Sequence, residues 1–204
     1  EARELPPVSL PDIVFPFLSQ GYLRTGERGR DSLLLLNASD WGGHHHHDSL
    51  DLYYWKDGRE LLSDLGYLWD HPDSGMTRRT FSHNTALLEG AGQKTQGRGG
   101  SFHLFCSTPR LKAMEASCTA YDKAEVYRRT CVQVDHGPAG AYVLDIFRVK
   151  GGKSRQYVFH GPGNDYEVEG LRGERPTTEA APVRFAVRFH LPKLGEVFVD
   201  DVEI

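Results

Sequence analysis

The chain has 204 residues, which is long enough for one or two domains, each with a substantial core. Its 24 basic and 28 acidic residues give a formal net charge of −4, and the two signs are mixed along the chain. No basic run or arginine stripe indicates a nucleic-acid partner. Hydrophobic residues make up 39% of the chain, and no apolar stretch approaches the roughly 20 residues of a membrane span. The composition predicts a soluble globular protein.

The ends and the cysteines add two expectations. The chain starts at Glu1 with neither an initiator methionine nor a signal-peptide pattern, and it ends at Ile204 directly after a strand-like run. We therefore expect trimmed ends or an internal fragment, and no targeting segment indicates a compartment. The three cysteines are widely spaced and odd in number, which favours buried free thiols over a disulfide framework: Cys106, Cys118 and Cys131.

Strand periodicity dominates the chain, and helical spacing is absent apart from a short turn expected near Pro11–Leu18. The segment Asp48–Tyr54 alternates in polarity, and Asp57-Gly58 after it predicts a hairpin turn. The predicted strands, in chain order, are Leu33–Leu36, Asp48–Tyr54, Glu60–Asp64, Asn84–Leu88, Phe102–Cys106, Leu111–Ala116, Ala124–Val134, Ala141–Val149, Gln156–His160, Val183–Phe189 and Gly195–Ile204.

Many short strands with Gly-rich connections predict an all-β fold, an antiparallel β-sandwich with a jelly-roll-like arrangement. The sequence divides into an N-terminal connector (1–20), a β-sandwich (21–165), a linker (166–182) and the strands of a truncated second β-module (183–204). The linker boundary rests on composition, since that stretch is rich in Gly, Pro, Glu and Thr and has little to bury.

Four consecutive histidines, His44 to His47, form the most distinctive segment of the chain. Their mid-chain position beside patterned sequence speaks against a purification tag. We expect the run to open a strand, so that His44, His46 and Asp48 share one face while His45 and His47 share the other.

Two imidazoles on one face of a strand can converge on a metal ion, with further ligands from neighbouring strands. Asp64 ends the returning strand of the hairpin and His83 opens the next apolar strand, so a His/Asp/His zinc site is geometrically reasonable. A solvated histidine cluster at a strand end fits the spacing equally well.

The order of these residues resembles the core pattern of the heparinase II/III-like family of polysaccharide lyases. That pattern is G-H-x-H-x-D, an alternating strand, a Gly turn, Asp-x-Gly, R-x-T-x-x-H-N-T and a Gln. The matching residues are His44, His46, Asp48, Gly58, Asp64, Gly66, Arg78, Thr80, His83, Asn84, Thr85 and Gln93. Segments around Tyr127, Asp145, Gly151 and His160 also resemble the second half of the same sandwich, and the resemblance covers roughly residues 20–165.

The resemblance implies a structural zinc ion held by His46, Asp64 and His83. It also implies that His44 faces the substrate cleft, where it handles the uronate carboxylate or a proton. The adjacent histidines leave a second register open, in which His45 and His47 take these positions; the gap-free spacing from Asp48 to Gly58 favours the first register.

The family cleaves uronate-containing polysaccharides by β-elimination, so the resemblance implies an anionic polysaccharide substrate and a periplasmic or secreted location. In the family, most of the catalytic groups lie on an upstream (α/α) toroid domain that has no counterpart in these residues. We therefore expect this chain to form half of an active site and to be inactive by itself.

Other residues are weaker candidates for the cleft. Tyr67 is a candidate catalytic tyrosine, and Arg78 and His160 are candidate substrate-binding residues; an ordinary structural role fits each of them too. Three tryptophans, Trp41, Trp55 and Trp69, are candidates for stacking on sugar rings or for core packing.

Two other classes of protein fit parts of the pattern. A cupin-like metalloenzyme also uses an HxH strand, but the chain lacks a well-placed glutamate after it. A non-catalytic carbohydrate-binding module is the second alternative, because the tail from Val183 resembles the last strands of galactose-binding-like jelly rolls.

Overall fold

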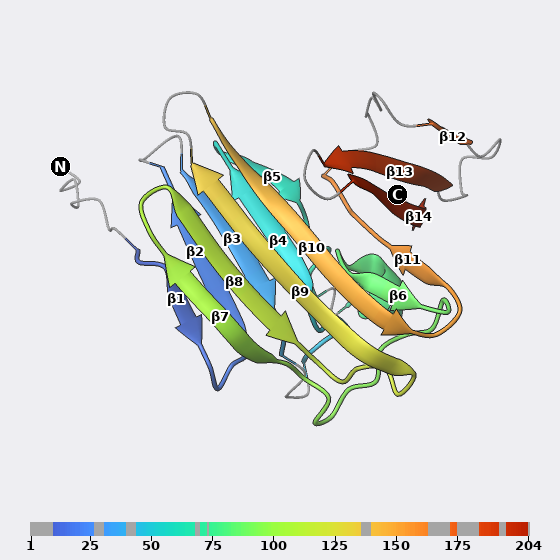
Figure 1. The fold of residues 1–204 in the computed structure, drawn as a ribbon. Coiled ribbons are helices and arrows are strands. Elements are labelled where there is room, and N and C mark those ends of the chain that lie inside the picture. The colour runs from blue at the N-terminus through green and yellow to red at the C-terminus, as the bar shows by residue number, and fades with distance from the viewer. Residues whose placement is uncertain are drawn as a thin grey trace.

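Figure 1 shows a computed structural model of the chain, which describes residues 10–26, 31–39, 44–67, 70–72, 74–135, 140–162, 172–174, 184–191 and 195–203. Regular structure in these residues is nearly all β-strand, arranged in two five-stranded sheets and one four-stranded sheet. Strand pairing is antiparallel with one exception, described below. The structure thus confirms the predicted all-β, antiparallel sandwich.

The first sheet is a meander whose strands follow one another in sequence. Its strands are β1 (Ile13–Phe15), β2 (Gln20–Thr25), β3 (Ser32–Asn37), β4 (Asp51–Lys56) and β5 (Arg59–Leu62). The predicted hairpin turn joins β4 to β5, and both Asp57 (φ 51°) and Gly58 (φ 78°) are in the left-handed region. Such a turn matches the twist of the flanking strands.

The second sheet is also a meander and packs face to face on the first (Figure 1). Its strands are β7 (Ser101–Ser107), β8 (Leu111–Ser117), β9 (Ala124–Asp135) and β10 (Ala141–Gly151). Leu34 and Leu52 of the first sheet share one buried core with Met114 of the second. All three cysteines are free; Cys118 and Cys131 are buried, whereas Cys106 is partly exposed, contrary to expectation.

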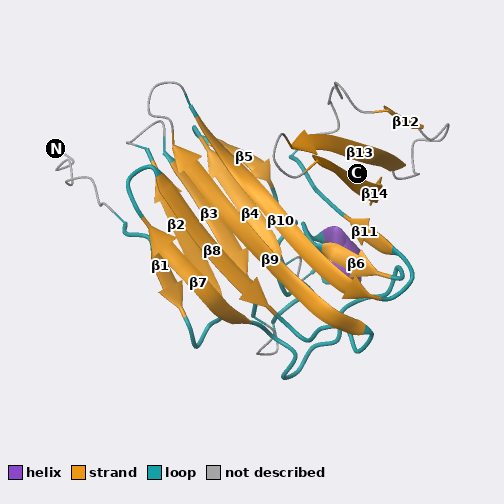
Figure 2. Cartoon of the chain, viewed as in Figure 1, coloured by secondary structure: helices purple, strands orange, loops and turns teal. Residues whose placement is uncertain are grey.

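The third sheet has the strand order β12-β13-β14-β11-β6. Its strands are β6 (Ala86–Leu88), β11 (Arg155–Tyr157), β12 (Arg172–Glu174), β13 (Arg184–Leu191) and β14 (Gly195–Glu203), and β11 pairs with β14 in parallel. Two short helices, α1 (Ser74–Thr77) and η1 (Thr80–Ser82), precede β6 (Figure 2). In the described part of the chain no helix has the length and apolarity needed to cross a membrane.

The sequence patterns did not predict the first two strands, β1 and β2. Instead of a lone turn near Pro11–Leu18, β1 lies there and pairs with β2, Ile13 opposite Tyr22. Part of the predicted connector thus belongs to the first sheet, and the predicted linker is described only at 172–174. The strands predicted after the linker are present as β13 and β14, in one sheet with β6 and β11, and the domain boundaries themselves stay predictions.

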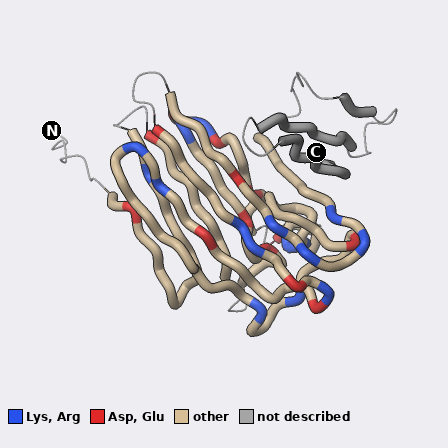
Figure 3. The backbone as a smooth tube through the Cα atoms, in the orientation of Figure 1, with Lys and Arg blue, Asp and Glu red and all other residues tan. Residues whose placement is uncertain are grey.

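Basic and acidic residues are interspersed along the described part of the backbone (Figure 3). This distribution matches the mixed charge of the sequence.

Candidate functional site

The histidine run lies in the loop before β4, because β4 begins only at Asp51. The expectation that the run opens a strand, with adjacent histidines on opposite faces, is wrong. Contacts from other segments hold the loop instead: the backbone N–H of His47 donates to the Arg78 carbonyl at 2.9 Å. Leu50 then takes a positive φ of 68°, which turns the chain before the strand starts.

The loop brings His46 together with Asp64, which follows β5, and His83, which follows η1. One ligand atom from each of the three lies within 4.8 Å of the others. His83 Nδ1 is 2.7 Å from Asp64 Oδ2, and the ring centroids of His46 and His83 are 5.2 Å apart. These are the three residues that the resemblance implied as zinc ligands, and the structure forms a His/Asp cluster able to hold a metal ion.

A metal ion fits the chemistry of this cluster. His83 has no exposed surface, and its Nε2 is buried without a hydrogen-bond partner. A buried polar atom without a hydrogen-bond partner destabilises the fold. A metal ion bound by the imidazole lone pair would supply the missing partner. Two nitrogens and a carboxylate oxygen are donors that zinc commonly takes.

A second donor set shares His83 and adds Asp48 and Asp51, again with ligand atoms within 4.8 Å of one another. Both carboxylates already have partners: Asp48 accepts from Asn37 Nδ2 at 2.8 Å, and Asp51 accepts from the backbone N–H of Asn84 at 2.7 Å. Asp64 has hydrogen-bond partners as well, but its set offers two imidazole nitrogens beside one carboxylate, a donor combination that zinc commonly takes, so we regard the set that contains His46 as the better metal site. Sequence reasoning missed Asp51, although its place in an alternating strand beside the histidines was a usable signal.

The electrostatics of the cluster favour a positive charge. Burial raises the pKa of Asp48 to about 7, and the neighbouring Asp51 charge adds to this. Burial alone would lower the pKa of His83, but the hydrogen bond to Asp64 and the surrounding carboxylates raise it above the ordinary value. Burial lowers the pKa of His46, and the charge of His83 acts in the same direction. Three carboxylates thus surround His83, and a cation among them would relieve their repulsion.

Asn84 fixes the segments around the cluster. Its Nδ2 donates to the carbonyls of Leu52 and Ser63, each at 2.9 Å, and its Oδ1 accepts from the backbone N–H of His160 at 2.6 Å. The side chain has no exposed surface. It therefore ties β4, the segment after β5 and the segment after β11 together beside His83.

A buried arginine in the second sheet, Arg129, reaches the same region. Its guanidinium binds Asp145 with two hydrogen bonds, Nε to Oδ1 at 2.9 Å and Nη2 to Oδ2 at 2.5 Å. Its Nη1 donates to the carbonyls of Leu50 and Asn84, and thus links the histidine loop to the segment of His83. Sequence reasoning gave Arg129 no role. It alternates in β9 with Tyr127 and Cys131, which are buried, and this spacing could have indicated that its side chain also points into the core.

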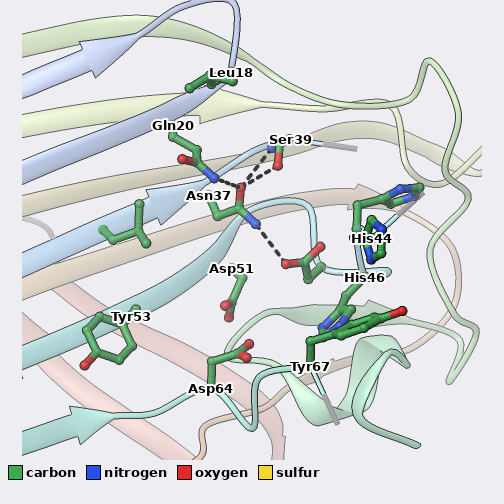
Figure 4. Close-up of a pocket in the computed structure, with 13 residues that line it drawn as sticks. Leu18, Gln20, Asn37, Ser39, His44, His46, Asp51, Tyr53, Asp64 and Tyr67 are labelled. Atoms are coloured by element: carbon green, nitrogen blue, oxygen red, sulfur yellow. Dashed lines mark hydrogen bonds between the residues drawn. The ribbon is translucent and has the colours of Figure 1, made fainter. Parts of the chain in front are cut away.

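An open cleft of about 550 Å³ lies beside the cluster, on the outer face of the first sheet. His44 and Tyr67 line it at the end where the metal cluster lies (Figure 4). Tyr67 is 40% exposed. Its ring stacks on the His46 ring, with the ring centroids 5.9 Å apart, and meets the His44 ring edge-on, with the centroids 5.3 Å apart. The histidine loop therefore supplies the buried His46 to the cluster, while His44 and His45 line the cleft beside it.

The other candidates occupy different places. Arg78 is half-buried beside the histidine loop, and its Nε is buried without a partner, but it is not among the residues that line the cleft. His160 Nε2 lies 2.8 Å from the Phe81 carbonyl, also away from the cleft lining. Trp55 lies half-buried on β4 outside that lining, and Trp41 and Trp69 fall outside the described residues.

Three solved structures share this fold. Heparinase III, the BT4657 gene product, has a TM-score of 0.70 at 16% identity, over 92% of this chain and 30% of that one. A heparan sulfate lyase HepC from Pedobacter heparinus has a TM-score of 0.57 at 18% identity, over 66% and 21%. A second heparinase III has a TM-score of 0.64 at 13% identity, over 84% and 28%. The chain thus spans less than a third of each, and no curated protein sequence matches it.

Fold and site together define a β-sandwich with a His/Asp cluster able to hold a metal ion. The family model described as "Heparinase II/III-like, C-terminal" matches residues 11–202, nearly the whole chain. The chain belongs to this heparinase II/III-like, C-terminal family.

Proposed function

We propose that this chain forms one wall of the active-site cleft of a polysaccharide lyase that cleaves uronate-containing polysaccharide by β-elimination. The observation that carries the proposal is the placement of His44 and Tyr67 in an open cleft directly against the cluster of His46, Asp64 and His83. Family membership and the heparinase-like fold support it. An upstream (α/α) toroid domain would form the opposite wall.

In β-elimination a base removes the proton at C5 of the uronate, the C4–O bond breaks, a C4=C5 double bond forms, and the leaving oxygen takes a proton. His44 and Tyr67 both carry groups that exchange protons, and both face the space where the sugar would lie. Arg78 lies beside the loop but outside the cleft lining. We keep it as a candidate for the uronate carboxylate, whose negative charge grows as the proton leaves, because a guanidinium fork matches a carboxylate. His160 stays a weaker candidate for binding substrate, since its ring lies against the Phe81 carbonyl.

His46, Asp64 and His83 would hold a zinc ion, which would supply positive charge among the carboxylates and join the histidine loop to β5 and η1. His46 would then fix the ring of Tyr67 by stacking, and the short loop would fix His44. The role of the metal is structural in this proposal. On family resemblance alone, we place the protein in the periplasm or outside the cell.

The proposal is tested by the absorbance of the unsaturated uronate product. We expect no product from this chain alone. A protein that joins it to its upstream helical domain should form product, and should lose it with His44→Ala or Tyr67→Phe. It should keep it with His103→Ala, which changes an exposed histidine of the second sheet outside the cleft lining. Product from the isolated chain would overturn the half-site proposal, and full activity of both cleft variants would overturn the roles of His44 and Tyr67.

A further inference from the structure

A buried glutamine, Gln93, on the segment between β6 and β7, contacts the histidine loop with its side-chain amide. Gln93 is only 3% exposed. Its Oε1 accepts from the backbone N–H of Ser49 at 2.7 Å, and its Nε2 donates to the backbone carbonyl of the same residue at 2.8 Å. One side-chain amide thus bonds both backbone groups of Ser49, as a neighbouring β-strand would.

The backbone of Gln93 holds a second residue of the loop. Its carbonyl oxygen lies 2.7 Å from Nδ1 of His47. Because a carbonyl can only accept, Nδ1 of His47 carries a proton in this contact. Gln93 therefore bonds the two residues that flank Asp48, and the first of these directly follows the candidate metal ligand His46.

Gln93 is itself anchored to two other elements. Its backbone N–H donates at 2.8 Å to Oγ1 of Thr80, which begins η1 ahead of His83. Its Nε2 also donates to the hydroxyl of Tyr127 in β9 at 3.0 Å, and that buried hydroxyl donates to the Ala86 carbonyl. Both amide protons and Oε1 are therefore in use, and Gln93 joins the histidine loop to η1 and to the second sheet.

The loop needs such contacts because its backbone is strained next to Ser49. Leu50 has a φ of 68°, and a leucine in the left-handed region is unfavourable unless its surroundings hold it there. The two Gln93 bonds act on the residue directly before Leu50, and Arg129 binds the Leu50 carbonyl. Relaxation of this torsion would change the path of the loop, and with it the position of His46.

From these contacts we infer that Gln93 is a positioning residue, which holds the histidine loop in the conformation that places His46 in the metal cluster and His44 in the cleft. The role belongs to the amide and not to the volume of the side chain, because both bonds to Ser49 come from the amide. The inference rests on the proposed function, since it names the residue that orders the proposed metal site and cleft wall.

Gln93→Met keeps the length of the side chain and removes the amide. Gln133→Met is the matched control, because Gln133 is also a glutamine without exposed surface, but its Nε2 donates to Ser32 in β3 at 2.6 Å. Hydrogen exchange of the Ser49 amide, followed by ¹⁵N NMR without metal, reports on the loop. Competition with a chelator gives the zinc dissociation constant of the same chain.

We expect Gln93→Met to speed exchange of the Ser49 amide by about tenfold or more, because this N–H loses its acceptor. The zinc dissociation constant should rise by about 10- to 100-fold, the usual effect of changing groups that orient metal ligands. Gln133→Met should leave both quantities unchanged.

The inference is overturned if Gln93→Met changes neither quantity, or if Gln133→Met changes both as much, because Gln93 would then only fill space. If Gln93→Met does not fold, Tyr127→Phe replaces it. That variant removes the hydroxyl that holds Gln93 Nε2 and should speed Ser49 exchange by a smaller factor, whereas unchanged exchange overturns the inference. If the unmodified chain binds no zinc, the metal part of the proposed function fails, and Ser49 exchange alone decides the role of Gln93.

Discussion

At position 129 an arginine with no exposed surface connects the second sheet to the two segments that carry the candidate metal ligands. Removing one partner of such a buried ion pair leaves the other charge uncompensated. We expect Arg129→Ala to lower the free energy of unfolding by about 3–5 kcal/mol in urea titrations, because Asp145 would stay buried without its partner.

The neighbouring Arg128 provides the matched control. Its side chain is 38% exposed and lies 3.3 Å from Glu115. Exposed ion pairs contribute little, so Arg128→Ala should lower the free energy of unfolding by less than about 1 kcal/mol. Equal losses from the two variants would show that the buried network does not hold the sheets together.

Two glycines, Gly58 in the β4–β5 hairpin turn and Gly151 at the end of β10, differ in why a larger side chain is disfavoured. A side chain at Gly58 would meet no atom within 4 Å, so its positive φ is the only obstacle to substitution. A Cβ at Gly151 would lie 2.0 Å from the Lys123 carbonyl oxygen, which is part of the backbone, and φ is +109° there as well. The second site therefore has a steric reason for glycine that the first lacks.

Gly58→Ala should lower the free energy of unfolding by about 1 kcal/mol, the usual effect of a side chain at a left-handed position. Gly151→Ala should lower it further, because the backbone at the β9–β10 pairing must move. Thermal unfolding of the two variants measures this order. The opposite order would contradict the close packing of Gly151 on Lys123.

Strand patterns predicted most of the sheets because alternation records which side chains are buried, as with Leu52 and Tyr54 in β4. The same reasoning failed for the histidine run, where contacts with Arg78 and Gln93, distant in sequence, fix a loop. The cluster of His46, Asp64 and His83 was implied by family resemblance. Spacing did not indicate that Gln20 and Asn37 line the cleft together, since this depends on the register between β2 and β3, in which Gln20 lies opposite Asn37.

For the whole molecule, the metal cluster joins the segment before β4, the segment after β5 and the segment after η1. A ligand that binds only the folded state stabilises it by an amount that grows with the logarithm of one plus the ratio of ligand concentration to dissociation constant. Zinc at a hundred times its dissociation constant should therefore raise the free energy of unfolding by about 2.7 kcal/mol. Calorimetry with and without a chelator measures the effect, and His83→Ala should abolish it. Unchanged unfolding in zinc would mean that the metal does not brace the fold.

The most direct test of the account is the zinc content of the purified, zinc-equilibrated chain and four variants, measured by elemental mass spectrometry. The unmodified chain and His45→Ala, whose histidine belongs to neither donor set, should hold equimolar zinc. His46→Ala, Asp64→Ala and His83→Ala should each hold much less, with circular dichroism showing that the strands remain. Zinc retained at full stoichiometry in all three would contradict the assigned ligands, and with them the metal-braced cleft wall.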